Sequence, residues 1–222
     1  MPSTYADLLE TLREEASYGL DIAFLEDDAR MLALLARTAD RIARDAEVYA
    51  LAIGFTPVAG QREYPLAAIA TGVGFSRRVA QVLGLSRDGA EFRNLAPIAA
   101  YRLAPSSTPG VVRKVYTAPE SILLDPTPTV GEAARVWTAS ALVLPDLPTA
   151  DGTNAPNLPD ELAELVPMMA LGSAARRAMQ GEQFARIKAA MDEAAATIAG
   201  YRARSRAARY AIREPRTRMV AR

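Results

Sequence analysis

Apolar residues recur at helical spacing near the amino end of the chain. Residues 3–16 predict a first helix, because Ser3 or Thr4 can cap it and leucines gather on one side. A longer helix is predicted from about residue 25 to 49, since its apolar positions trace a single stripe. The residues of that stripe are Phe24, Met31, Leu35, Ile42 and Tyr49.

The same kind of pattern returns near the carboxyl end. Pro159 and the two acids after it suit the first turn of a helix with an apolar side, which is predicted to kink at Pro167. Gly181 is predicted to mark a corner before a last helix, because apolar residues repeat every three or four positions over residues 184–201. Helix-compatible composition continues to about Ile212.

Helical periodicity disappears between residues 51 and 145, where Gly, Pro and Thr become frequent. The stretch "VAGQREYPL" (58–66) predicts a strand-turn-strand hairpin with Gly60 in the turn. "NLAPIAAYRLA" (94–104) favours a short helix or an irregular crossing segment. The short, punctuated strand candidates indicate a small sandwich or barrel. They are residues 48–55, 63–66, 78–85, 111–117, 121–124 and 133–144.

The order of these elements predicts an α+β fold. Helices from both ends of the chain each carry an apolar stripe, so we expect them to pack as an antiparallel helical bundle with a small all-β domain inserted between them. The expected parts are an amino-terminal half of the bundle, the inserted β domain, a carboxy-terminal half of the bundle and a basic tail. Their ranges are 1–50, 51–145, 146–201 and 202–222.

Composition then removes most catalytic chemistry. The chain has no cysteine and no histidine, which excludes disulfides, thiol nucleophiles, Ser-His-Asp relays and imidazole-held metals. "TGVGFSR" (71–77) lacks the last glycine of a dinucleotide loop. Asp27 and Asp28, with Glu26 before them, could in principle bind a metal, but they suit the positive end of a helix better. A carboxylate-based hydrolase stays as an alternative, but it needs a pair of acids that nothing in the sequence brings together. We therefore expect no catalytic residue, no cofactor, no metal and no enzyme.

Nothing in the sequence points to a membrane. The longest nearly apolar run, 66–75, is far shorter than a membrane helix requires, and the acidic amino end does not resemble a secretory signal. The protein is expected to stay in the compartment where it is made.

Charge is distributed unevenly although the net charge is zero. Residues 202–222 hold eight arginines against Glu214, a net charge of +7, whereas residues 1–50 carry a net charge of −6. Three interpretations of this basic tail are open: a solvated end, a contact with nucleic-acid phosphates, or docking on an acidic protein.

Three further stretches are informative when they are taken in order. They are "ADRIARDAEVYALAIGFTPVAGQREYPL", "VVRKVYTAPESILLDPTPTVGEAARVWTAS" and "NLPDELAELVPMMALGSAARRAM". Together they resemble the head-to-tail adaptor proteins of tailed bacteriophages, the group that includes tail tubular protein A. By this resemblance, the protein is a structural part of the virion neck, assembled in the host cytoplasm. It would form a ring of twelve copies below the portal, close the DNA-filled head and hold the tail or nozzle.

The resemblance also assigns partners. Loops of residues 51–145 would contact the tail or nozzle protein, and DNA would pass through the ring. The carboxy-terminal segment would dock on the portal protein through Arg202, Arg204, Arg206, Arg209, Tyr210, Arg213, Arg216, Arg218 and Arg222. The alternative is a nucleic-acid-binding module that acts through the same arginines. We favour protein contacts, because a strongly basic lumen would retard the DNA.

Overall fold

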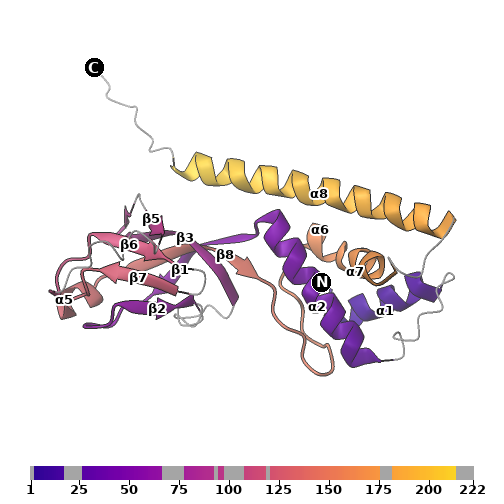
Figure 1. Ribbon diagram of the computed structural model, residues 1–222, viewed down its shortest axis with the longest axis horizontal. Helices are drawn as coiled ribbons and strands as arrows, with labels where there is room; N and C mark the ends of the chain where they lie inside the picture. The colour runs from indigo at the N-terminus through magenta and orange to yellow at the C-terminus, as the bar shows by residue number, and fades with distance from the viewer. Residues whose placement is uncertain are drawn as a thin grey trace, which may run out of the picture. The chain divides into compact units, whose positions relative to one another are not determined.

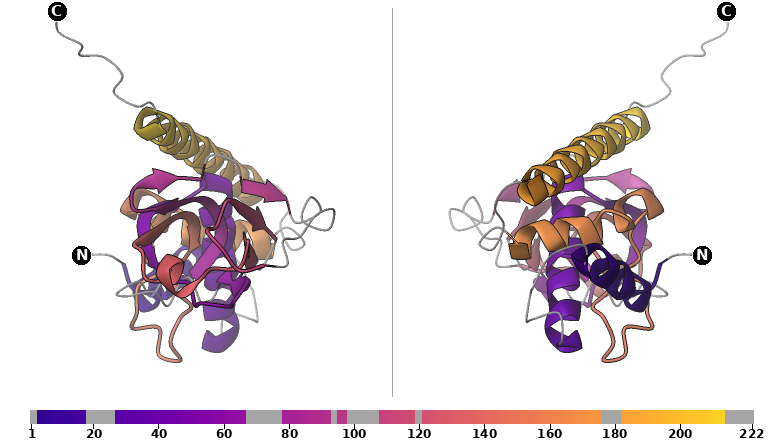
Figure 2. Two further views of the ribbon diagram at one scale, coloured as in Figure 1. Left: turned by 90° about the vertical axis from the view of Figure 1, so that its left-hand side faces the viewer. Right: turned by 90° about the vertical axis from the view of Figure 1, so that its right-hand side faces the viewer.

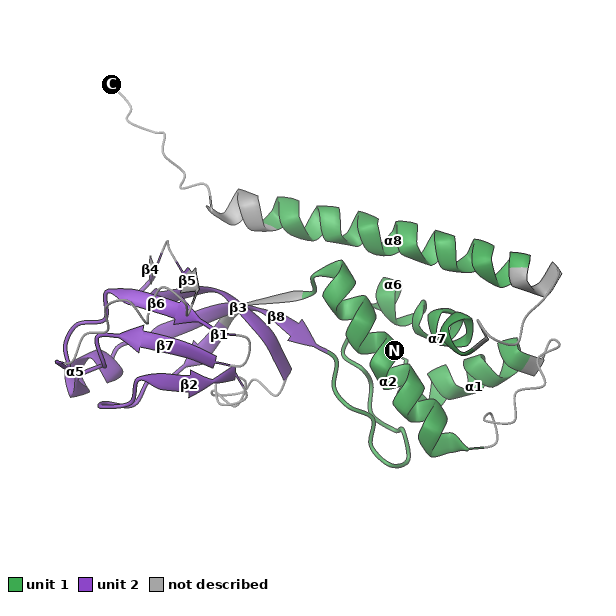
Figure 3. Ribbon diagram, in the orientation of Figure 1, with its two compact units in different colours: residues 1–48, 145–222 green, residues 49–144 purple. Residues whose placement is uncertain are grey.

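The computed structural model describes residues 3–17, 27–66, 78–92, 95–97, 108–118, 121–175 and 182–213. The chain forms two compact units, coloured separately in Figure 3. Unit 1 joins residues 1–48 to residues 145–222, and unit 2 comprises residues 49–144. Helices build unit 1 and two small sheets dominate unit 2, so the predicted α+β class is confirmed.

Unit 1 packs helices from both ends of the chain around α7. This helix is apolar on nearly all sides, which is typical of a buried helix, and it contacts α1, α2 and α8. Figures 1 and 2 show α8 running along the outside of the other helices of the unit. The helices are α1 (Tyr5–Ser17), α2 (Asp28–Ala46), α6 (Asp160–Ala163), α7 (Val166–Ala175) and α8 (Glu182–Arg213).

The predicted apolar stripes form the core of unit 1. In α2, Met31, Leu35 and Ile42 are fully buried, and in α8 the seam is buried at Ala194 and Ile198. Gly172 of α7 allows α8 to approach closely, because a Cβ at that position would lie 2.1 Å from the Met191 sulfur. Tyr49 lies in a strand instead of the end of the second helix.

The first two helices begin with side-chain caps. Thr4 and Asp7 form a capping box, in which the Thr4 N–H donates to the Asp7 carboxylate at 2.8 Å and the Asp7 N–H donates to the Thr4 hydroxyl at 3.2 Å. These bonds hold the pKa of Asp7 below its ordinary value, the Thr4 backbone N–H contributing most. Asp27 caps α2 by accepting from the Arg30 N–H at 3.1 Å.

The helix predicted around Pro167 is in fact two helices. Glu164 and Leu165 form a turn between α6 and α7, and Pro167 is the second residue of α7. A proline costs nothing in a first turn, where its missing N–H would have no intrahelical partner. The predicted kink is therefore wrong, because the chain stops one helix and starts another.

The described residues of unit 2 form two four-stranded sheets. One has the order β1-β8-β3-β4 and the other the order β2-β7-β6-β5, and all pairings are antiparallel except β5 with β6. A short helix, α5 (Val130–Ala133), precedes β8. The strands are β1 (Tyr49–Phe55), β2 (Glu63–Pro65), β3 (Arg78–Arg87), β4 (Ala90–Glu91), β5 (Leu95–Pro97), β6 (Lys114–Thr117), β7 (Ser121–Asp125) and β8 (Trp137–Leu144).

Two local predictions in this unit are wrong. Residues 58–66 do not form a hairpin, because β1 pairs with β8 and β2 pairs with β7 in the other sheet. Gly60 does occupy a turn, with φ +79°, so the turn signal was real and only the pairing was not local. Residues 95–97 form a strand instead of a helix, and the rest of the 94–104 segment lies outside the described residues.

Aromatic side chains join the two sheets. The Phe55 ring makes edge contacts with Tyr64, at 5.0 Å between centroids, and with Trp137, at 6.2 Å. The Tyr64 hydroxyl bonds to the backbone at Val58 and Gln61, which fixes the loop after β1. Burial raises the pKa of Tyr64, so this hydroxyl remains a donor throughout the neutral range.

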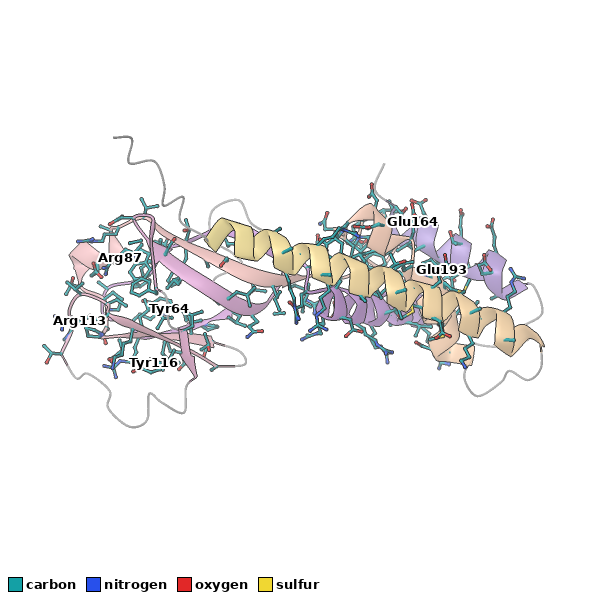
Figure 4. The ribbon with its side chains drawn as sticks, turned by 90° about the horizontal axis from the view of Figure 1, so that it is seen from above. Tyr64, Arg87, Arg113, Tyr116, Glu164 and Glu193 are labelled. Atoms are coloured by element: carbon teal, nitrogen blue, oxygen red, sulfur yellow. The ribbon has the colours of Figure 1, made fainter. Side chains whose placement is uncertain are left out.

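A buried carboxylate organises one end of unit 2. Glu132 is 2% exposed and pairs with Arg87 of β3. The same carboxylate oxygen accepts from the Val112 N–H at 3.0 Å, and the Glu132 carbonyl accepts from the Trp137 indole at 3.0 Å. The Arg87 guanidinium, labelled in Figure 4, also lies over the Phe92 and Trp137 rings. One buried acid thus ties α5, β3 and the segment before β6 together.

Candidate partner-binding surface

The arginines predicted to dock on the portal begin within a long helix. Because α8 ends at Arg213, six of the nine predicted positions lie on it, and Arg216, Arg218 and Arg222 lie outside the described residues. Side chains are described for Arg202, Arg204 and Arg206 only. The amino end of the predicted tail is therefore part of α8, a helix of unit 1.

Glu47 gathers two of these arginines. Arg202 donates to the Glu47 carboxylate at 2.8 Å, and the Arg206 Nε donates to both of its oxygens at 3.1 and 3.2 Å. The buried Ser205 hydroxyl donates to the Glu47 carbonyl at 3.2 Å. Only 14% of the Glu47 side chain is exposed, against about half of each arginine side chain. These bonds link α8 to the end of α2.

The position of Glu47 explains why it attracts cations. It ends α2 in a left-handed conformation, with φ 53°, and its N–H donates back to the Ala43 and Arg44 carbonyls. A carboxylate at the negative end of a helix is unfavourable by itself. Two guanidinium groups from α8 compensate both the carboxylate and the helix end.

Arg204 points to a different acid. Its Nη2 donates to both Glu161 oxygens, at 2.7 and 2.6 Å, and its guanidinium lies 5.8 Å from the Tyr201 ring centroid. The Arg204 and Glu161 side chains are 62% and 46% exposed. An exposed pair of this kind contributes at most about 1 kcal/mol, so Arg204 can change partner at little cost.

A groove of about 500 Å³ lies between α2 and α8, beside the two arginines that bind Glu47. Met169 of α7 and Ile198 of α8 give it apolar walls, and alanines of α8 widen it. Its charged members are Arg41 and Asp45, which pair along α2 at 3.6 Å, and the Glu47-bound Arg202 and Arg206. Such a groove suits an apolar side chain whose neighbours are acidic.

The described residues offer little for other chemistry. No group of three or more acidic residues among them could hold a metal ion. Asp27 caps α2 and Asp28 pairs with Arg13, which agrees with the structural interpretation of the acidic triplet, and Glu26 lies outside the described residues. No helix in the described ranges has both the length and the apolar character of a membrane span.

Sequence reasoning missed the acids that hold the arginines. Glu47 and Glu161 are 155 and 43 residues away from their partners, and neither stands in a local motif. The overall contrast between an acidic first part and a basic last part was the only signal available. That contrast identifies no particular residue.

Comparison with known protein families identifies the family of this chain. A family model described as SU10 adaptor protein matches residues 3–218, nearly the whole chain and both units. No curated protein matches the chain. The resemblance to phage head-to-tail adaptors is thereby confirmed at the level of the family. This family consists of structural phage adaptors and is not a known class of enzymes. The chain belongs to the SU10 adaptor protein family.

Proposed function

We propose that this protein forms a ring beneath the phage portal, closes the DNA-filled head and provides the platform on which the tail or nozzle assembles. The family match over residues 3–218 is the observation that carries this proposal. By the earlier resemblance, the ring has twelve copies, lies in the virion neck and is assembled in the host cytoplasm. DNA passes through its centre.

The portal contact is assigned to the arginine-bearing end of α8 and the residues after it. Each of the three arginines with a described side chain already bonds to a carboxylate of unit 1. That chemistry supports acidic protein as the partner of the remaining arginines, at 209, 213, 216, 218 and 222. Aromatic residues that could stack on bases are few in this segment, which favours the portal over DNA as the partner.

Ring closure requires a heterologous interface, in which one face of a subunit fits a different face of the next. Unit 1 has faces of opposite charge that could steer such a pairing. Asp7, Glu10 and Glu14 are exposed on α1, whereas the far end of α8 is basic. We assign ring contacts to unit 1 and tail contacts to the loops of unit 2.

The proposal is tested in the phage that encodes this chain. When its gene is disrupted, we expect heads that package DNA, leak it and carry no tail, and we expect the wild-type gene supplied in trans to restore tailed, infectious particles. Electron microscopy and DNA release from the heads provide the readouts. Tailed, infectious particles without this protein would refute the proposal.

A complementing variant separates docking from folding. Replacing Arg209, Arg213, Arg216, Arg218 and Arg222 by glutamine spares the arginines bound to Glu47 and Glu161, so the protein should fold normally. Its recovery on heads should fall at least tenfold. The matched control replaces Arg186 and Lys188, at the other end of α8, by glutamine and should bind heads as the wild type does. Equal recovery of both variants would remove the arginines from the portal contact.

A further inference from the structure

One end of unit 2 exposes several valines. The large apolar side chains that are exposed among the described residues number five, and four of them belong to this unit. Val58, Val111, Val130 and Val136 are 50–77% exposed. Val58, Val111 and Val136 lie in loops, and Val130 begins α5, which Figure 1 labels.

Backbone hydrogen bonds hold three of these segments side by side. The Gly60 N–H donates to the Pro128 carbonyl at 3.0 Å, and the Gly110 N–H donates to the Thr127 carbonyl at 2.9 Å. The chain at Thr127 and Pro128 therefore lies between the loop of Val58 and the segment of Val111. Val130 follows two residues later as the first residue of α5.

Val136 is fixed at the same end by the turn between β3 and β4. Its N–H donates to the Asp88 carboxylate at 3.1 Å, and the Asp88 N–H donates to the Val136 carbonyl at 2.7 Å. Glu132 then bonds to the backbone of Val112, next to Val111. The buried acid and this turn thus hold the backbone at Val136 and next to Val111 in place.

Two cations border this patch. Arg113 and Lys114 are exposed and follow Val111 in the chain, and Figure 4 labels Arg113 at this end of the unit. Within the described ranges, neither side chain is paired with an acid. The surface therefore has an apolar centre and a positive edge. Exposed apolar surface with a polar rim is a mark of protein–protein interaction sites.

We propose that this valine patch (Val58, Val111, Val130 and Val136, bordered by Arg113 and Lys114) docks the tail-side protein of the neck through an apolar surface with an acidic rim. This inference rests on the proposed function. Charge complementarity selects the acidic rim. The small size of the patch argues against a second copy, because permanent interfaces between subunits bury roughly 2,000 Å² or more. A few valine side chains that fill pockets of the partner suit a protein that binds after the ring has formed.

The test is a Val130→Asp/Val136→Asp variant supplied to the phage that lacks its own copy. These are the two most exposed valines, so the variant should fold, and its melting temperature should match that of the wild type. We expect heads that contain DNA and keep this protein but carry at least tenfold fewer tails. The new carboxylates would repel an acidic rim as well as spoil the apolar contact.

Controls keep this result apart from a failure of the proposed function. Leu147→Asp places an acid on an exposed apolar residue of unit 1 (58% exposed) and should leave tails in place. Normal tails on the valine variant would overturn the patch while leaving the adaptor role intact. Heads that lose the variant protein altogether would also overturn it, since the patch would then serve the ring or the portal. Arg113→Gln/Lys114→Gln should reduce tail number by a smaller factor than the valine variant.

Discussion

Replacing Arg87 by alanine is expected to destabilise unit 2 by about 2–4 kcal/mol, because it leaves the buried Glu132 carboxylate without its main cation. The loss includes the hydrogen bond from Arg87 to the Val112 carbonyl at 3.1 Å and the contacts with the Phe92 and Trp137 rings. Arg135 remains 3.0 Å from the other Glu132 oxygen, in an ion pair without hydrogen-bond geometry, so the loss stays below that of a fully isolated charge. Urea unfolding monitored by the fluorescence of Trp137, the single tryptophan, measures it.

Two further variants identify the cause. Arg135→Ala removes a half-exposed arginine from the same acid and should cost less than about 1 kcal/mol. Adding Glu132→Gln to Arg87→Ala should recover part of the loss, because glutamine still accepts from the Val112 N–H and carries no charge. If the double variant is no more stable than Arg87→Ala alone, burial of an unpaired charge is not the reason for the effect.

Replacing Glu47 by arginine is expected to detach the carboxyl half of α8 from the other helices of unit 1. Three guanidinium groups would then meet where one carboxylate now binds Arg202 and Arg206, and like charges at such distances cost several kcal/mol. Because the two arginines are half-exposed, solvent screens part of this repulsion. We expect the local free energy of unfolding of this part of α8 to fall by about 1–3 kcal/mol. Backbone amides after Tyr201 should exchange with solvent about 10–100 times faster.

The matched control is Glu161→Arg, which reverses the other acid that binds α8. Glu161 and Arg204 are both well exposed, so this change should alter exchange by less than about fivefold. Amides near Ala194 and Ile198 should keep their protection in both variants, because apolar burial holds that part of α8. Equal exchange rates in the two charge-reversal variants would show that Glu47 contributes no more than Glu161 to holding α8.

Features that depend on local periodicity could be predicted from the sequence. The stripe through Met31, Leu35 and Ile42 predicts a helix because burial on one side requires that spacing, and all three are buried. Short strands between turn residues likewise indicate a β unit. The family resemblance rests on motifs within these same elements, and the family match agrees with it.

Features that depend on distant pairing could not be predicted. The turn at Gly60 is visible in the sequence, but nothing local states that β2 pairs with β7 instead of β1. Pro167 is compatible with a kink and with a helix start, and only the packing of α7 decides between them. From the sequence, the arginines that bind Glu47 and Glu161 belong to a basic tail outside the bundle, because their acids lie far away in the chain.

The most direct test of the central claim, that the basic end of α8 couples this adaptor to protein and not to DNA, is photo-cross-linking in intact particles. A photoreactive amino acid at position 210 lies on α8 beyond the arginines bound to Glu47. The account predicts a covalent product with the portal protein. A product with the packaged DNA, and none with the portal, would contradict it.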